Sequence, residues 1–272
     1  MKKQDLNPAK DQHILQNKEI IEQEITAAEL TNEDEVIEIG AGPGNLTRAI
    51  AAKAKKVLAF EIDKRFKKDL ESLPKNVEVI YANALKQKWK GWNKIIANIP
   101  YALSEPIIWK AIEDEIHMLV IIVGDNFKEI LCSRERKMGY VAQLFFSIKP
   151  ILFVKRSEFL PQPRTDSWMI RLTRKEQKTM ENIMGEILRS DQRAKNAIMH
   201  ALVHEGKTKN QARKIIEKIG IAENVLKERA RKLPRDALLI IENVIEKELR
   251  YLRKWAFPKY ARARPRGKEK NL

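Results

Sequence analysis

Short runs rich in β-branched residues alternate with helical patterns from about residue 33 to residue 175. This alternation is typical of an α/β fold, in which a mostly parallel sheet carries helices on its faces. The runs that predict strands are residues 36–39, 57–61, 77–81, 95–97, 118–123, 142–148 and 167–172. The helical patterns between them span residues 14–30, 46–54, 65–73 and 105–113. We expect the last two strands to close the sheet in antiparallel orientation.

The pattern changes after Lys175 to helices alone, with charged residues interleaved at three- and four-residue spacing. The predicted helices span residues 180–188, 195–205, 209–219 and 237–252. Beyond Trp255, six Lys and Arg residues stand against a single Glu, and two prolines interrupt any regular element. We therefore expect an α/β domain over residues 1–175, a small helical domain over residues 176–254 and a flexible basic tail over residues 255–272.

Lys and Arg total 53 against 37 Asp and Glu, for a formal net charge of +16. Such an excess favours a polyanionic partner, although charge alone does not separate RNA from DNA or from an anionic membrane surface. The longest apolar run, residues 118–123, is far shorter than the roughly 20 residues that cross a bilayer. No signal peptide is recognisable, and the only cysteine, Cys132, cannot form an internal disulfide. We expect a cytoplasmic protein with no membrane partner and with Cys132 as a small buried side chain.

A glycine-rich turn follows the first predicted parallel strand and opens a helix. Its three glycines, Gly40, Gly42 and Gly44, allow a ligand to approach the backbone closely at the helix N-terminus. A dinucleotide fingerprint needs its third glycine at position 45, where this chain has Asn45, and Pro43 removes a backbone donor that a pyrophosphate would use. The turn therefore favours a nucleoside cofactor without a pyrophosphate, such as S-adenosylmethionine.

Two polar side chains are expected beside this turn. Glu61 ends the second predicted strand, about 20 residues after Gly40, where a carboxylate can accept hydrogen bonds from both ribose hydroxyls. An ordinary polar strand end is the alternative. Asn83 follows the third predicted strand, where its amide could pair with the adenine of the cofactor, although an Asn in a surface turn fits this position as well.

The tetrapeptide from Asn98 to Tyr101 follows the fourth predicted strand and is the most specific chemical signal in the sequence. An adenine exocyclic amine is a poor nucleophile because its lone pair is delocalised into the ring. The Asn98 side-chain carbonyl and a backbone carbonyl at Ile99 or Pro100 could each accept one amine hydrogen, which leaves the lone pair facing an activated methyl group. Pro100 fixes the turn, and Tyr101 offers a face on which an extruded base can stack. No strong general base is required, so catalysis would depend on positioning and electrostatics.

Four motifs together resemble the ribosomal RNA adenine dimethyltransferase family, and the resemblance covers roughly residues 8–250. They run from Asp11 to Leu15, from Glu38 to Thr47, from Asn98 to Tyr101 and from Phe159 to Ser167. The sequence looks closest to the archaeal small-subunit type, which modifies two adjacent adenosines near the 3′ end of the RNA. The resemblance implies a Rossmann-like methyltransferase fold with S-adenosylmethionine as cofactor. It also implies a monomer that acts on small-subunit rRNA in the pre-ribosomal small subunit, with the helical domain binding RNA.

The resemblance further implies roles for individual residues. Asn98 and Pro100 would hold the amine, and Tyr101 and Phe159 would sandwich the target base, an arrangement that aromatic stacking makes physically sensible. The residues implied to bind the cofactor are His13, Leu15, Gly40, Gly42, Glu61, Ile62, Asn83 and Asn98. The sequence departs from the family pattern at Ile14, usually Phe, at Gln16 and Asn83, both usually Asp, and after the fifth strand, where Gly124 and Asp125 begin a segment that usually carries Gln and Glu.

Two alternative functions stay open at this point. The chain could methylate adenine in another RNA, such as large-subunit rRNA, or it could be a ribosome-assembly factor with little or no catalysis. A dinucleotide oxidoreductase is disfavoured by Asn45 and by the tetrapeptide after the fourth strand. His200 and His204 stand one helical turn apart, which is metal-ligand spacing, but Glu205 is the only further ligand nearby. We expect these histidines in helix packing or RNA contact and predict no metal site.

Overall fold

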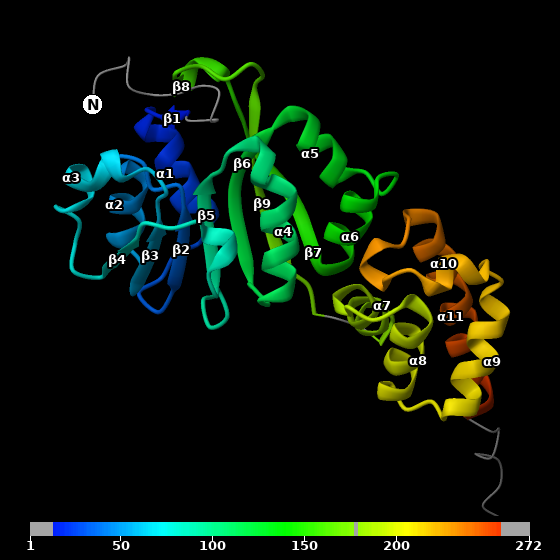
Figure 1. The fold of residues 1–272 in the computed structure, drawn as a ribbon. Helices are drawn as coiled ribbons and strands as arrows, with labels where there is room; N and C mark the ends of the chain where they lie inside the picture. Colours follow the sequence, from blue (N-terminus) through cyan, green and yellow to red (C-terminus); the bar gives the residue numbers. More distant parts are fainter. Residues whose placement is uncertain (1–12, 177–178, 257–272) are drawn as a thin grey trace, which may run out of the picture. The chain divides into compact units, whose positions relative to one another are not determined.

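The computed structural model describes residues 13–176 and 179–256, with side chains described as far as residue 250. The chain divides into two compact units, Met1–Glu176 and Gln177–Leu272 (Figure 1). Each unit buries apolar side chains of its own. The assignment of catalysis to the first unit and RNA binding to the second stays a prediction. Residues 255 and 256 of the expected tail are helical, and the rest of it, residues 257–272, lies outside the described residues.

The first unit contains a seven-stranded sheet with the order β4-β3-β2-β5-β6-β9-β7 (Figure 1). The five parallel strands are β2 (Glu35–Ile39), β3 (Lys56–Phe60), β4 (Val77–Ile80), β5 (Lys94–Asn98) and β6 (Met118–Gly124). The antiparallel strands β9 (Ser167–Arg174) and β7 (Phe146–Val154) close the sheet beside β6. This arrangement confirms the expected Rossmann-like sheet and its antiparallel end.

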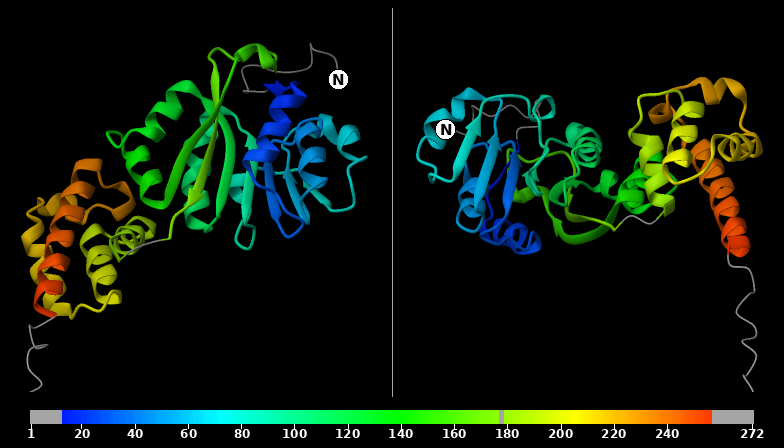
Figure 2. Two further views of the ribbon diagram at one scale, coloured as in Figure 1. Left: turned by 180° about the vertical axis from the view of Figure 1, so that it is seen from behind. Right: turned by 90° about the horizontal axis from the view of Figure 1, so that it is seen from below.

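Helices cover both faces of this sheet. One face carries α1 (Lys18–Ala27) and α2 (Asn45–Ala51), and the other carries α4 (Ser104–Glu113), α5 (Asp125–Cys132) and α6 (Lys137–Phe145), as Figures 1 and 2 show from opposite sides. A short helix, α3 (Lys67–Leu70), follows β3 after a 3-10 turn. Under α1 and α2 the strands contribute Val36, Ile96, Val120 and Ile122 to the core. Alternate strand residues thus point to opposite faces, as the pleat requires.

A small two-stranded sheet joins the N-terminal segment to a distant loop. Strand β1 (Ile14–Leu15) pairs antiparallel with β8 (Phe159–Leu160). The His13 ring reinforces the junction, because its Nδ1 donates to the carbonyl oxygen of Pro161 at 2.7 Å. Asn17 caps helix α1 by accepting a hydrogen bond from the amide of Glu19 at 2.9 Å. The first of the four sequence motifs therefore lies against the last one.

Three predictions from the sequence were wrong in detail. The helix expected over residues 14–30 begins only at Lys18, because residues 14 and 15 form a strand and Asn17 supplies the cap. In the strand expected over residues 142–148, the first four residues belong to α6, where Ala142, Leu144 and Phe145 are all buried. A short run with few polar residues does not reveal its own period. Cys132, expected to be buried, ends α5 and is exposed.

The described part of the second unit consists of helices and turns, with one isolated β-bridge between Arg193 and Arg229. It contains α7 (Thr179–Arg189), α8 (Ala194–His204), α9 (Lys209–Ile219), α10 (Glu223–Lys227) and α11 (Arg235–Ala256). Four of these match the predicted helices, and the short α10 was not predicted. Thr208 and Gln211 form a capping box at the start of α9, and Gly220 ends that helix in the left-handed conformation. Among the described residues, no helix is long and apolar enough to cross a membrane.

Candidate active site

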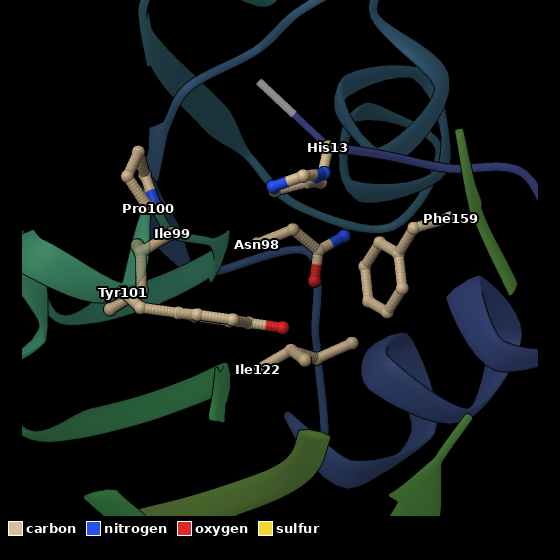
Figure 3. A pocket seen from close by; sticks show the side chains of 7 residues that line it. All are labelled: His13, Asn98, Ile99, Pro100, Tyr101, Ile122 and Phe159. Carbon is tan, nitrogen blue, oxygen red and sulfur yellow. The ribbon is translucent and has the colours of Figure 1, made fainter. Parts of the chain in front are cut away.

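Two neighbouring cavities open at the carboxyl ends of the parallel strands, where α/β sheets commonly bind ligands. The first, which we call the base cavity, is lined by His13, Asn98, Ile99, Pro100, Tyr101, Ile122 and Phe159 (Figure 3). The second, the cofactor cavity, is lined by His13, Ile14, Leu15, Ile21, Glu38, Gly40, Ala41, Gly42, Pro43, Asn45, Leu46 and Asn98. His13 and Asn98 line both. Ligands bound in the two cavities would therefore approach each other beside His13 and Asn98.

The glycine-rich turn after β2 forms the floor of the cofactor cavity. Gly40 and Gly42 have φ angles of 81° and 53°, which side-chain-bearing residues rarely adopt. A Cβ atom added at Gly42 would meet no atom within 4 Å, so this part of the backbone faces open space. The turn thus presents bare backbone to a ligand, as its sequence predicts.

Glu61 lies beneath this turn. Its Oε2 accepts a hydrogen bond from the Gly42 amide and its Oε1 accepts one from the Asp63 amide, both at 2.7 Å. The carboxylate is buried and held in a fixed orientation, and each oxygen keeps a further lone pair. Glu61 therefore stabilises the glycine turn and does not line the cofactor cavity in this conformation.

Ile62 and Asn83 are likewise outside the two cavities. Ile62 is 71% exposed, which is unusual for a large apolar side chain next to a sheet. Asn83 is exposed, and its side-chain oxygen accepts a hydrogen bond from the Leu85 amide at 2.9 Å. That bond makes Asn83 the cap of a short 3-10 turn over residues 84–86. The structure thus brings together five of the eight predicted cofactor residues, and leaves Glu61, Ile62 and Asn83 at the margin.

Asn98 is the last residue of β5 and stands between the two cavities. Its Nδ2 donates to Glu24 Oε2 at 3.3 Å, while its Oδ1 is buried with no hydrogen-bond partner. Figure 3 shows this oxygen directed into the space bounded by Tyr101, Ile122 and Phe159. A buried carbonyl oxygen without a donor is unfavourable in isolation, and such exceptions are concentrated at functional sites.

Two buried carboxyl groups lie beside Asn98. The pKa of Glu24 is raised to about 8, mainly by burial and to a smaller extent by the nearby Glu38, while the Asn98 hydrogen bond acts to lower it. Burial likewise raises the pKa of Glu38 to about 8. One oxygen on each of the two side chains, Glu24 Oε1 and Glu38 Oε2, has no hydrogen-bond partner. Glu38 lines the cofactor cavity, and an acid with a raised pKa in a cavity wall is typical of functional sites.

The two aromatic residues of the base cavity, Tyr101 and Phe159, are fixed by the strands around them. The Tyr101 hydroxyl shares a 2.6 Å hydrogen bond with Ser167 Oγ on β9. A Cβ atom added at Gly124 would lie 3.5 Å from the Tyr101 ring, so the glycine leaves the ring in close contact with the end of β6. Phe159 belongs to β8 and is buried. The cavity has a volume of about 20 Å³, enough for a single water and too small for a nucleobase in this conformation.

Several site residues were not predicted, and they include Glu38 of the cofactor cavity. Ile122 forms part of the base cavity from β6, and Glu24 holds the Asn98 amide from α1. The sequence does carry a signal for Glu24, because it falls on the apolar stripe of its helix with Ile20, Ile21 and Ala27. An acid on a buried stripe is an anomaly that points to a specific partner.

The two histidines with metal-ligand spacing contact a carboxylate. His200 Nδ1 and His204 Nδ1 lie 2.6 Å and 3.2 Å from the two oxygens of Glu186 on α7. Across residues 13–176 and 179–250, no group of three or more potential ligands could hold a metal ion. These contacts join α7 to α8 inside the second unit.

The sheet order and the glycine turn after β2 define a Rossmann-like fold, and solved structures share it. Residues 3–240 match the family described as ribosomal RNA adenine dimethylase. The chain belongs to this family, which depends on S-adenosylmethionine. The resemblance inferred from the four motifs is therefore confirmed.

Curated relatives match over nearly their whole length. A probable ribosomal RNA small subunit methyltransferase A of Methanococcus maripaludis is 32% identical over 258 residues, which cover 88% of this chain and 97% of the relative. The protein of the same name from Methanopyrus kandleri is 33% identical over 257 residues, covering 88% and 91%.

Solved structures share the fold. A dimethyladenosine transferase from Plasmodium falciparum superimposes with a TM-score of 0.60 at 24% identity, covering 87% of this chain and 98% of that one. The 23S rRNA methyltransferase ErmE gives a TM-score of 0.58 at 20% identity, covering 86% and 99%.

Proposed function

We propose that the chain transfers methyl groups from S-adenosylmethionine to the exocyclic amine of two adjacent adenosines near the 3′ end of small-subunit rRNA. The observation that carries this proposal is the unpartnered Asn98 Oδ1, buried where the cofactor cavity meets the base cavity. The names of the archaeal relatives support the small subunit as the substrate. The net charge of +16 supports a polyanionic partner.

The residues of the cofactor cavity fit S-adenosylmethionine. The bare backbone at Gly40 and Gly42 accommodates close approach, and the free oxygen of Glu38 provides an acceptor for an ammonium or an N–H group. His13, Leu15 and Asn98 complete the walls. We assign the ribose to the free lone pairs of Glu61, and the adenine to Ile62 and Asn83 at the exposed margin of the site.

The reaction requires little acid–base chemistry from the protein. The cofactor supplies an electrophilic methyl group on a sulfonium. Asn98 Oδ1 accepts one hydrogen of the target amine, and a backbone carbonyl accepts the other. The Pro100 carbonyl already accepts the Leu103 amide at 2.8 Å, so Ile99 is the better second acceptor. Both contacts draw the amine out of conjugation, and the proton becomes acidic once the methyl group is attached.

The aromatic residues position the base. Tyr101 is fixed by Ser167, whereas Phe159 belongs to the small β1–β8 sheet that closes the cavity. We propose that the β1–β8 side moves outward to admit the base and that the two rings then enclose it. Stacking of this kind contributes about 1–3 kcal/mol per base.

The direct test uses purified small subunits that lack the modification, together with isotopically labelled S-adenosylmethionine. We expect label in dimethyladenosine, at two adjacent positions mapped by primer-extension stops. Label confined to large-subunit rRNA would contradict the choice of substrate. Tight subunit binding without cofactor binding in calorimetry would instead support a non-catalytic assembly factor. We further propose that the protein acts as a monomer in the cytoplasm on the pre-ribosomal small subunit, and light scattering tests the monomer.

A further inference from the structure

Glu24 is a carboxylic acid in an apolar environment. It lies on α1 with 0% of its surface exposed, on the same stripe as Ile20, Ile21 and Ala27. Burial of an acid without full hydrogen bonding costs free energy, and a Leu or Met at this position would pack against the sheet without that cost. The position therefore calls for an explanation beyond packing.

A buried charged residue elsewhere in the fold gives a useful contrast. Lys94 at the start of β5 forms an ion pair with Asp34 at 2.9 Å and also donates to the carbonyl oxygens of Ala28 and Glu29. That group has well-formed polar partners and ties α1 to the sheet. Glu24 has one long hydrogen bond, the 3.3 Å contact from Asn98 Nδ2, and its other oxygen has no partner. Glu24 thus contributes little to the cohesion of the fold through polar contacts.

The contact between Glu24 and Asn98 determines which way the Asn98 amide faces. An Asn amide has two orientations that differ by a half-turn and exchange its oxygen with its NH2 group. An acceptor at Glu24 favours the orientation in which the NH2 group faces α1 and the oxygen faces the base cavity. In the opposite orientation two sets of N–H donors, from Asn98 and from the target amine, would face each other and the amine would lose its acceptor.

We infer that Glu24 is a positioning residue for methyl transfer, which acts by holding the Asn98 amide with its oxygen toward the target amine. This inference rests on the proposed role of Asn98. Glu24 itself lines neither the base cavity nor the cofactor cavity, so it acts through Asn98. The neutral acid can serve as well as the carboxylate, because its carbonyl oxygen remains an acceptor.

The test compares Glu24→Gln, which keeps an acceptor oxygen, with Glu24→Leu, which removes it at similar size. Glu22→Leu, on the exposed side of the same helix, is the matched control. For each variant we would measure kcat and KM for unmodified small subunits, and the affinity for S-adenosylmethionine by calorimetry. Circular dichroism checks the fold, and Glu24→Met replaces Glu24→Leu if the latter does not fold.

We expect kcat of Glu24→Leu to fall about tenfold, the equivalent of one missing hydrogen bond in the transition state. KM and the affinity for S-adenosylmethionine should remain at the level of Glu22→Leu, and Glu24→Gln should recover most of kcat. The inference is overturned if Glu24→Leu retains kcat, if Glu24→Gln falls as far as Glu24→Leu, or if cofactor affinity falls in parallel with kcat.

Asn98→Ala separates this inference from the proposed function. If Asn98→Ala is inactive and Glu24→Leu is fully active, the role of Asn98 stands and only the role of Glu24 is wrong. If Asn98→Ala itself transfers methyl groups at the wild-type rate, the proposed mechanism fails, whatever the Glu24 variants do.

Discussion

The buried acid at Glu24 predicts a specific pH dependence of stability. The pKa of this carboxyl group is raised by burial from an ordinary value of 4.5 to about 8 in the folded chain. Between these two values the unfolded chain has released the proton while the folded chain still holds it. The contribution of Glu24 to stability is therefore greatest below the unfolded-state pKa and falls as pH rises toward the folded-state pKa.

The size of the effect follows from the linkage between proton binding and folding. When the folded state holds one more proton than the unfolded state, the free energy of unfolding falls by about 1.4 kcal/mol for each unit by which the pH rises. Glu24→Gln mimics the neutral acid and does not titrate. Relative to this variant, the wild type should lose about 3 kcal/mol over two pH units, from about pH 5.5 to about pH 7.5.

Urea unfolding of the cofactor-free protein, followed by circular dichroism at several pH values, measures this difference. Glu22→Gln removes an acid from the exposed side of the same helix and serves as the control. The two Gln variants should diverge as pH rises, with Glu24→Gln becoming the more stable. A constant difference between wild type and Glu24→Gln across this range would refute the buried, neutral state of Glu24.

Three further predictions concern other parts of the chain. Lys94→Met removes the positive charge beside buried Asp34, which keeps only its hydrogen bonds from Thr31 and Asn93, and should cost about 3 kcal/mol of unfolding free energy. Lys55→Met, which removes an exposed ion pair, should cost less than about 1 kcal/mol in the same urea assay. Tyr101→Ala should weaken binding of a single-stranded target RNA by about 1–3 kcal/mol, measured by filter binding, while Tyr101→Phe keeps the ring and should bind as the wild type does. Removal of residues 257–272 should lower the slope of log affinity against log salt by about 0.7–0.9 for each phosphate that this segment neutralises, and an unchanged slope would exclude its binding to RNA.

The sheet could be predicted because four of its five parallel strands, β2, β3, β5 and β6, are largely buried and read as short, bounded apolar runs. The glycine turn and the tetrapeptide after β5 could be assigned because both follow such strands directly. The error at residues 142–145 has a related physical origin, since a short, mostly apolar run looks alike in a helix and in a strand, and the half-buried Gln143 does not reveal the period. The exposure of Cys132 was also predicted wrongly, because a small apolar side chain does not reveal from the sequence whether it is covered.

Contacts between residues far apart in the chain could not be predicted. Asn98 meets Glu24 across 74 positions, and His13 meets Pro161 across 148. The sequence identifies Asn98, Glu24 and His13 as polar, but only the folded chain determines their partners, one of which is the backbone carbonyl of Pro161. The position of Glu61 is a similar case. Its carboxylate was expected to face a ribose directly, and it first satisfies the amides of Gly42 and Asp63.

The central claim is that the Asn98 side chain orients the target amine for methyl transfer. Single-turnover transfer from S-adenosylmethionine to pre-bound, unmodified small subunits tests it most directly, with wild type compared against Asn98→Ala. The account predicts that the variant binds RNA normally and transfers methyl groups at least about 100-fold more slowly, as when a preorganised catalytic dipole is removed. Transfer at the wild-type rate by Asn98→Ala would contradict it.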